Sequence, residues 1–445
     1  MYTRKPEVKE LIEKRDWTRL RQLATKWAVA DVAELLLELE KPDRVVFYRS
    51  LPRLLAAEVF AFFEPDEQDA FLQDLTDEEA RVLMENLAPD DRTALLEELP
   101  AEVTQRLLSF LSPSDLKQAR QLLGYPEESV GRLMTPDYVA VKPEFTVSQV
   151  MDEIRRKGRD SETINAIYVT DPVDRLTGSV ALRQVVLANP NDRIRGLMRA
   201  PAISASAFDD REEAARLMAR YDLPVLPVVD SQGVLVGIVT ADDVLEVAQE
   251  ETTEDFHKAA GVTPLHVSLK DARPGLIYKS RVMWLLLLIG VYLISGTIMS
   301  RFEDVIAKVV PLVFFLPLLI DSAGNAGAQS AALMVRALAT GDVESKEWVR
   351  VLTREVGLSL ALGATMGFTV WAVAAFRTGG AIGIIAGVSM VVSVLIACLV
   401  GVAVPFAMAK FGMDPAAASS PLVTSVADIL GVLIYFSTAR IVLGI

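Results

Sequence analysis

Long apolar segments are confined to the part of the chain after about residue 280, and their lengths suit a lipid bilayer. A membrane-spanning helix needs about 20 mostly apolar residues. Five segments meet that requirement: residues 281–299, 309–336, 356–376, 382–411 and 421–445. Five buried core helices of this kind in one short region of a soluble protein are improbable. The pattern therefore predicts an all-α transmembrane bundle of five helices.

Residues 50–126 show a different pattern, in which short apolar stretches with helical spacing alternate with turn residues. The turn signals recur about every 12 residues, at Pro52, Pro65, Thr76, Pro89, Pro100 and Pro113. Thr76 with Glu79 forms a capping-box pattern, and Ser112 before Pro113 forms an N-cap with proline at the first helical position. Helices this short must stack to bury their apolar faces. The region is predicted to be an all-α superhelical domain of undetermined hand.

Residues 133–250 contain an internal duplication with an offset of about 60 residues. The segment IYVTDPVDRLTGSVALRQVV matches LPVVDSQGVLVGIVTADDVL, and LMTP recurs as LMRAP. Each copy is predicted to contain a strand, a helix, a hairpin and a second helix. At these residues the pair resembles tandem CBS modules, an α+β fold that packs back to back and commonly senses adenine nucleotides.

The resemblance to CBS modules also identifies a ribose-contact pattern, Gly-x-x-Thr-x-x-Asp. The second copy retains it at Gly237, Thr240 and Asp243. The first copy has Ala181 and Gln184 at the last two positions, and a neutral amide cannot accept two ribose hydroxyls as a carboxylate does. We therefore expect Thr240 and Asp243 to form at most a weak adenine nucleotide site.

Charge is distributed unevenly along the chain. Residues 1–270 carry 33 basic and 49 acidic residues, whereas residues 271–445 carry 12 and 10. The whole chain has a net charge of −14 and a mean hydropathy of +0.31. An acidic surface favours cations over nucleic acid. The only cysteine, Cys398, lies in an apolar segment, which excludes a disulfide framework and a cysteine-based zinc site.

The start of the chain and its short loops indicate how it is oriented in the membrane. The N-terminus has no apolar stretch of the kind found in a cleaved signal peptide. Basic residues precede the first span and separate the second from the third, and the side that they mark is cytoplasmic. We expect an inner-membrane protein with cytoplasmic N-terminal domains and an extracytoplasmic C-terminus.

Two parts of the soluble region are dense in carboxylates. Residues 51–100 contain 14 acidic and 3 basic residues, and residues 242–255 contain seven carboxylates and no basic residue. Solvated helix faces would account for any single acid. Like charges at this density destabilise a helix, however, and hard divalent cations prefer carboxylate oxygens. The clusters as a whole are candidate cation sites.

Carboxylates within membrane spans are costly and usually functional. Asp428 lies among apolar residues on a stripe with Thr424 and Gly431, and the spans offer no well-placed basic partner. An ionised Asp428 beside water and a passing cation is one interpretation, and a protonated Asp428 hydrogen-bonded to a neighbouring helix is the alternative.

The second span carries the other intramembrane acid. Asp321 begins the stretch DSAGNAGAQS, in which Asn325 and Gln329 add neutral oxygens. The small residues predict broken or unwound helix that lines a watery cavity, with a small-residue packing face as the alternative. One chain offers too few acids to surround a cation. A symmetric homodimer with paired Asp428 is the simplest closed pore.

The order of the domains and the motif P-x3-D-x2-G-N-x-G-x-Q resemble the MgtE family of magnesium channels over essentially the whole chain. The resemblance implies a helical-repeat domain at 1–130, CBS modules at 131–196 and 197–248, an amphipathic connecting helix at 249–276 and a transmembrane domain at 277–445. It implies Mg²⁺ as both substrate and effector of a homodimer in a lipid bilayer, and no enzymatic activity. The pore carboxylate falls on Asp428, and the implied cytoplasmic metal ligands are Glu58, Asp90, Asp210, Glu212, Asp222, Asp243, Glu246, Glu251, Glu254 and Asp255. The expected pore lining comprises Asp321, Asn325, Gln329, Thr424 and Gly431.

These features favour a pore for inward Mg²⁺ flux. The pore is expected to close when cytoplasmic Mg²⁺ bridges the acidic residues of the helical-repeat domain, the CBS modules and the connecting helix. A transporter for Mn²⁺, Co²⁺ or Ni²⁺, or a membrane-tethered sensor without transport, remains an alternative. Anion channels and divalent exporters with CBS modules usually carry the membrane part first, which disfavours both classes.

Overall fold

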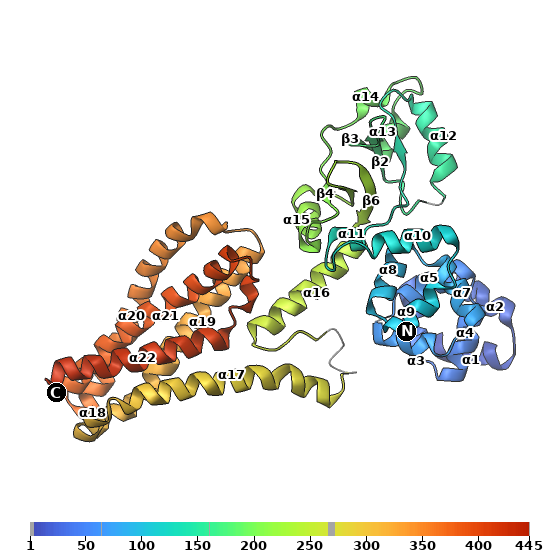
Figure 1. The fold of residues 1–445 in the computed structure, drawn as a ribbon. Coiled ribbons are helices and arrows are strands. Elements are labelled where there is room, and N and C mark those ends of the chain that lie inside the picture. Colours follow the sequence, from blue (N-terminus) through green and yellow to red (C-terminus); the bar gives the residue numbers. More distant parts are fainter. Residues whose placement is uncertain (1–3, 64, 160, 266–271, 445) are drawn as a thin grey trace. The chain divides into compact units, whose positions relative to one another are not determined.

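A computed structural model describes residues 4–63, 65–159, 161–265 and 272–444. The chain divides into two compact units, Met1–Gln249 and Glu250–Ile445, which are described separately. Figure 1 shows the order of the elements along the chain.

The first unit begins with ten short helices, drawn in blue to cyan in Figure 1. They are α1 (Arg4–Glu13), α2 (Trp17–Ala24), α3 (Val29–Glu38), α4 (Lys41–Ser50), α5 (Arg53–Ala61), α6 (Pro65–Leu72), α7 (Asp77–Asn86), α8 (Pro89–Glu98), α9 (Ala101–Leu108) and α10 (Pro113–Leu122). Helix α5 packs on α3, and each helix from α5 to α8 packs on the second helix after it in the chain. Their apolar faces form one continuous core. The predicted capping box is present, since Thr76 Oγ1 accepts from Glu79 N–H and the Glu79 carboxylate accepts from Thr76 N–H.

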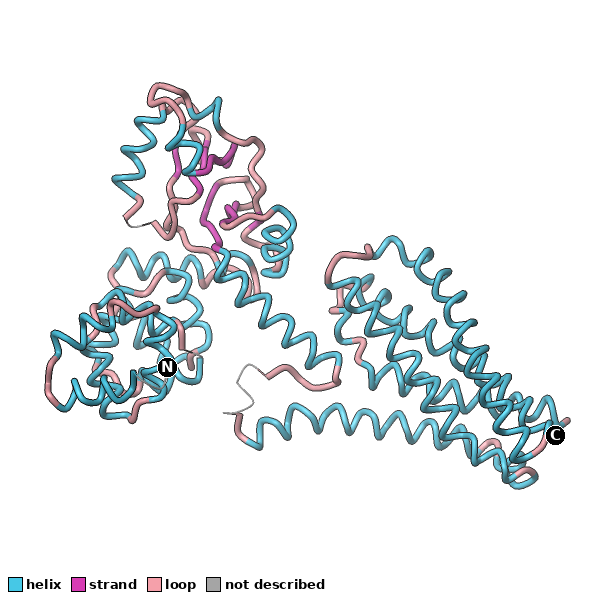
Figure 2. The backbone as a smooth tube through the Cα atoms, turned by 180° about the vertical axis from the view of Figure 1, so that it is seen from behind, coloured by secondary structure: helices cyan, strands magenta, loops and turns pink. Residues whose placement is uncertain are grey.

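The expected duplication is confirmed by two three-stranded sheets of the same topology. After α11 (Val130–Leu133), the first copy contains β1 (Ala140–Val141), α12 (Val147–Lys157), β2 (Ala166–Thr170), β3 (Leu176–Ala181) and α13 (Leu182–Leu187). After α14 (Ile194–Leu197), the second contains β4 (Ala205–Ser206), α15 (Arg211–Tyr221), β5 (Val225–Val229), β6 (Leu235–Thr240) and α16 (Ala241–Ala259). In each sheet the first strand is parallel to the central strand and the third is antiparallel to it. Figure 2 shows the strands in magenta between the helices of the two copies.

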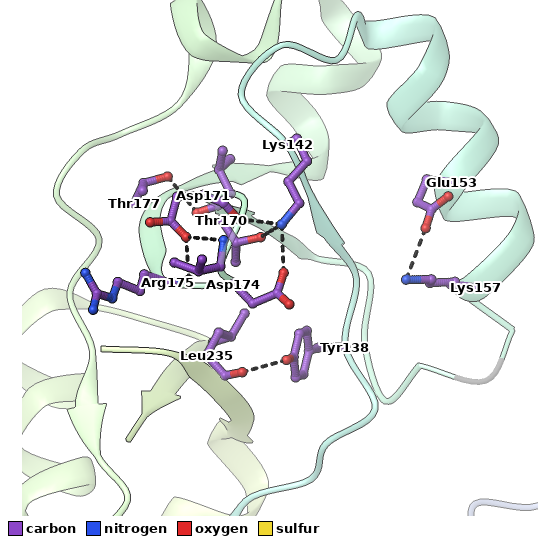
Figure 3. A network of polar contacts seen from close by, with 12 residues as sticks. Tyr138, Lys142, Glu153, Lys157, Thr170, Asp171, Asp174, Arg175, Thr177 and Leu235 are labelled. Carbon is purple, nitrogen blue, oxygen red and sulfur yellow. Dashed lines mark hydrogen bonds and ion pairs between the residues drawn. The ribbon is translucent and has the colours of Figure 1, made fainter. Parts of the chain in front are cut away.

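The two sheets share a small core that joins the copies. Tyr168 of the first copy is buried with Leu235 and Ile238 of the second. Figure 3 shows the polar edge of this contact, where Tyr138 Oη donates to Leu235 O at 2.9 Å. Beside it, Lys142 Nζ lies 2.7 Å from Asp174 Oδ1 and fixes the hairpin turn of the first copy. The CBS pair is therefore a single packed structure.

Within its described residues, the second unit contains five helices long and apolar enough to cross a membrane, as predicted. They are α17 (Pro274–Ser300), η1 with α19 (Val310–Phe315 and Leu316–Ala339), α20 (Trp348–Thr378), α21 (Gly380–Lys410) and α22 (Ser420–Leu443), and the short elements are α18 (Glu303–Lys308), η2 (Ser345–Glu347) and η3 (Pro415–Ala417). Helix α21 packs on α19, α20 and α22, and these four helices run side by side in Figures 1 and 2. Helix α17 packs along α22.

The acid-rich helix α16 is shorter at its C-terminal end than the connecting helix expected at 249–276. It ends at Ala259, and Gly261 follows with a left-handed backbone at φ 69°. Residues 266–271 of that expected helix lie outside the described residues, and α17 begins at Pro274.

Candidate cation sites

The carboxylate of Asp428 is buried within the membrane unit. Helix α22 begins after Ser419 with Pro421 in its first turn, which places Asp428 two turns into the helix. The residue is 6% exposed, and its Oδ1 has no hydrogen-bond partner among the described residues. A buried carboxylate oxygen without a donor is costly. Among the described residues of the single chain, no neighbouring helix donates a hydrogen bond to this oxygen.

Helix α19 approaches Asp428 through Gly324. A Cβ at position 324 would lie 2.7 Å from Thr424 Cγ2 and 3.3 Å from Asp428 Oδ1, so only glycine fits without a shift. The adjacent Gly327 lies against the backbone of Ala397 in α21. Asp321 lies on the same helix, about one turn before Gly324.

The prediction that residues 321–330 are broken or unwound is wrong. Helix α19 is continuous from Leu316 to Ala339, and the irregular 3₁₀ segment η1 precedes it. The small residues allow close packing against α21 and α22, so the helical hydrogen bonds need no replacement. The packing face and the polar stripe are both present, on different faces of α19. Gly324 and Gly327 are buried, whereas Asp321, Asn325 and Gln329 are exposed in the single chain. Asn325 Nδ2 donates to Asp321 Oδ2 at 3.3 Å.

A third carboxylate in the membrane helices, Glu355, is absent from the sequence prediction. Helix α20 begins at Trp348, earlier than the span expected at 356–376, so Glu355 lies two turns inside it. Ser330 Oγ of α19 donates to Glu355 Oε1 at 2.6 Å. Trp348 was the available signal, because tryptophan is enriched at the membrane interface and marks the start of a span.

A second group of acids forms in the first unit, between α8, α16 and the loop after α12. Pro89 opens α8 and Asp90 follows it, 9% exposed and with Oδ1 lacking a hydrogen-bond partner among described residues. Burial raises the pKa of Asp90 well above its usual range, and repulsion from Asp243, Asp91 and Glu162 adds to the effect. Burial, together with repulsion from Asp243 and Glu162, raises the pKa of Asp91 to about 7. We call Asp90, Asp91, Glu162 and Asp243 the α8–α16 acid cluster.

The structure thus brings together two predicted ligands, Asp90 and Asp243, and adds two that were missed. Glu162 lies far from the recognised acidic stretches in sequence, and its pKa is raised by burial and by Asp243. Glu246 and Glu58 lie near the cluster, since Glu246 raises the pKa of Asp91 and Glu58 that of Glu162.

The remaining predicted ligands in the CBS pair are separated within one chain. Asp210 caps the N-terminus of α15 by accepting from Glu212 N–H, whereas Asp222 follows its C-terminus in a left-handed conformation. Across the described ranges of this single chain, no three acidic, histidine or cysteine side chains converge closely enough to hold a metal ion.

The C-terminal part of α16 carries Glu251, Glu254 and Asp255. Lys258 forms ion pairs with Glu254 and with Asp414, which lies between α21 and α22. Burial and the Asp414 charge raise the pKa of Asp255. Glu254 therefore has a cationic partner from its own helix.

The predicted nucleotide contacts Thr240 and Asp243 bond to each other. Thr240 Oγ1 donates to Asp243 Oδ2 at 2.6 Å, and Asp243 also belongs to the α8–α16 acid cluster. This environment disfavours a polyphosphate. An open cavity of about 570 Å³ lies instead over the first copy, lined by Asn165, Ala181, Leu182, Arg183, Val186 and Leu187.

Comparison with known proteins identifies the family. The model of the MgtE family described as "Divalent cation transporter" matches residues 316–438, and the "MgtE intracellular N domain" matches residues 27–128. The "CBS domain" matches residues 130–190 and 194–250. The "Magnesium transporter MgtE" of Thermus thermophilus is 39% identical over 453 residues, which cover 98% of each chain. The chain belongs to the MgtE family. It is therefore a multi-pass membrane transporter and not an enzyme.

Further relatives agree with this membership. The "Magnesium transporter MgtE" of Bacillus subtilis is 36% identical over 324 residues, or 73% of this chain and 71% of that protein. A crystal structure of the cytosolic domain of the Mg²⁺ channel MgtE in complex with ATP matches 55% of this chain and 99% of its own, at 39% identity and a TM-score of 0.52. A structure of the soluble part of a magnesium transporter matches 56% of this chain and 97% of its own, at 26% identity and a TM-score of 0.53.

Proposed function

We propose that this MgtE-family chain forms a homodimeric pore for inward Mg²⁺ flux. The observation that carries the proposal is the buried carboxylate of Asp428, whose Oδ1 has no donor among described residues and lies against the backbone of α19. A hydrated Mg²⁺ keeps several of its waters, and these waters can donate to such an oxygen. Asp321, Asn325, Gln329, Thr424 and Gly431 line the same path.

The negative-inside membrane potential supplies the driving force. It contributes about 2.3 kcal/mol per charge per 100 mV, doubled for a divalent ion. The names of the relatives support Mg²⁺ as the substrate. A broader selectivity that includes Mn²⁺, Co²⁺ and Ni²⁺ is the competing proposal, because carboxylate and amide oxygens bind all of these ions.

We further propose that cytoplasmic Mg²⁺ closes the pore by binding the acidic groups of the soluble unit. At low Mg²⁺ the α8–α16 acid cluster holds mutually repelling charges, as the raised pKa values of Asp90 and Asp91 indicate. A divalent cation removes that repulsion and stabilises the state that binds it. A partner subunit would supply the missing ligands of the metal sites that contain the other predicted acids, namely Asp210, Glu212, Asp222, Glu251 and Asp255.

Adenine nucleotide binding is proposed at the first CBS copy. The cavity beside Arg183 offers a cationic side chain, which the pair Thr240 and Asp243 does not. The ATP-bound relative supports a nucleotide as ligand.

The decisive experiment measures Mg²⁺ flux into liposomes that contain the purified full chain. Asp428→Asn and Asp428→Ala should abolish flux without loss of folded protein, while Asp342→Asn, which removes an exposed carboxylate from the loop after α19, should retain it. Normal flux in both Asp428 variants would refute the pore assignment. Replacing Mg²⁺ by Mn²⁺, Co²⁺ or Ni²⁺ in the same assay decides the selectivity.

A further inference from the structure

The C-terminal end of α16 contacts the segment that leads into α22, the helix that carries Asp428 and that we call the pore helix. Lys258 Nζ lies 2.6 Å from Asp414 Oδ2. Asp414 Oδ1 in turn accepts from Ala416 N–H at 2.8 Å and so caps η3, directly before α22. One carboxylate therefore connects the lysine of α16 to the backbone of the α21–α22 segment.

Two further contacts hold the same end of α16. Gly261 lies against Pro421 in the first turn of α22, since a Cβ at Gly261 would be 3.2 Å from Pro421 Cγ. Thr263 N–H donates to Ser280 O of α17 at 3.0 Å. Pro421 is seven residues before Asp428, which corresponds to about 10 Å along a helix. We call Lys258–Asp414, Gly261–Pro421 and Thr263–Ser280 the α16 joint.

Among the described residues, Lys258 is the only basic residue of the α16 joint that forms an ion pair. Its ammonium group contacts two carboxylates, Glu254 and Asp414, and its side chain is only 26% exposed. Partial burial weakens screening by salt. The environment raises the pKa of Lys258 through its hydrogen bonds to Asp414 and Glu254, so the side chain remains charged at physiological pH.

We propose that Lys258 is a positioning residue that couples α16 to the pore helix. Its ion pair with Asp414 is the link: the pair is intact when the pore is closed and broken when the pore opens. A link shifts an equilibrium only by the difference between its strengths in the two states. This inference rests on the proposed function, because it assumes that α16 transmits closure by cytoplasmic Mg²⁺. The link contains no metal, and it operates in addition to divalent ions bound elsewhere on α16.

The functional test records currents from membrane patches whose cytoplasmic face is exposed to a Mg²⁺ titration. In Lys258→Met the Mg²⁺ concentration for half-closure should rise about two- to fivefold, the range expected for one partly exposed ion pair, while the maximal current is retained. Lys258→Arg preserves the charge and should restore the wild-type value. Lys410→Met is the matched control, because it removes an exposed lysine from the end of α21 that has no ion pair with a described residue.

A half-closing concentration in Lys258→Met equal to or below that of the wild type would overturn the proposal, as would an equal rise in Lys410→Met. If wild-type current is insensitive to Mg²⁺, the proposed regulation fails by itself, and the link is then judged by a second measurement.

The second measurement is hydrogen exchange of residues 411–419 in the full-length protein at saturating Mg²⁺. Loss of the Lys258 link should accelerate exchange of this segment, including the Ala416 amide, in Lys258→Met and not in Lys410→Met. Unchanged exchange in Lys258→Met would show that Lys258 does not hold the segment.

Discussion

Gly324 illustrates how one missing side chain determines the surroundings of an intramembrane acid. Its Cα packs against Thr424 and Asp428 of α22, and Gly327 of the same helix packs against α21. In a membrane, helices associate through packing of small residues more than through hydrophobic burial. The position of Asp428 therefore depends on a residue that has no functional group.

Gly324→Ala should disrupt the pore. The added Cβ would lie 2.7 Å from Thr424 Cγ2, and overpacking of this kind costs about 1–3 kcal/mol. We expect a lower thermal midpoint in detergent and reduced Mg²⁺ flux. Gly290→Ala is the control, because no atom lies within 4 Å of a Cβ at that position. Equal behaviour of the two variants would contradict the packing argument.

Glu355 and Ser330 provide a second residue-scale test, with Cys398 as a natural reporter. The thiol is buried and lies beside the Ser330–Glu355 pair. Glu355→Ala removes the acceptor for Ser330 Oγ and leaves a gap between α19 and α20. Maleimide labelling of this single cysteine should therefore be faster in Glu355→Ala than in the wild type. Glu355→Gln keeps an acceptor oxygen and should label slowly; fast labelling of Glu355→Gln would mean that charge, and not the hydrogen bond, closes this contact.

At the scale of secondary structure elements, the α8–α16 acid cluster shows how helix termini concentrate charge. Asp90 and Asp91 occupy the first turn of α8, and Asp243 occupies the first turn of α16. Helix N-termini favour negative charge, which makes each acid locally suitable. When the two helix termini and Glu162 meet in the folded protein, their carboxylates repel one another. This repulsion does not arise within either helix alone.

The pH dependence of stability follows from this repulsion. The folded-state pKa values of Asp90, Asp91, Glu162 and Asp243 are raised, that of Asp91 to about 7. The folded state therefore binds protons more tightly than the unfolded state. The free energy of unfolding should decrease as pH rises from about 4 to about 7 in the absence of divalent ions.

Thermal unfolding of the full chain in chelator across this pH range measures the effect. Added Mg²⁺ should raise the midpoint of the soluble unit at pH 7.5 and have little effect at pH 5, where protons already occupy the carboxylates. Asp91→Asn should reduce the slope, and an unchanged slope would remove Asp91 from the cluster.

At the scale of the whole molecule, the proposed sensing and the proposed conduction belong to different units of one chain. The soluble unit holds the acidic helical repeat and the CBS pair, and the membrane unit holds the five apolar helices with Asp428. Such a division implies that conduction survives the loss of a sensing domain.

Deletion of residues 1–126 should retain Mg²⁺ flux and weaken its closure by millimolar Mg²⁺, because Asp90 and Asp91 are then absent. Flux assays at graded internal Mg²⁺ provide the measurement. Closure of the truncated protein at the wild-type concentration would argue against a sensor in this domain, and loss of flux with intact folding would argue against separable units.

Periodicity and local chemistry alone were sufficient for much of this description. Five apolar segments each have the length of a membrane span, so the five helices follow from the energetic cost of exposing apolar side chains to water. The capping box at Thr76 and the repeated hairpins depend on neighbours within a few residues, and a linear pattern contains that information. Asp428 was identifiable as a candidate because a carboxylate among apolar residues is costly wherever its helix lies.

Only the tertiary structure decided which groups meet. Glycines in a stretch such as 321–330 are compatible with either a broken helix or close helix packing. In the folded protein α21 and α22 pack closely against these glycines, and α19 stays continuous. The partnership of Ser330 with Glu355, the addition of Glu162 to Asp90, and the pairing of Lys258 with Asp414 join residues 25 to 156 positions apart. Electrostatic energy depends on distance in space, which sequence separation does not specify.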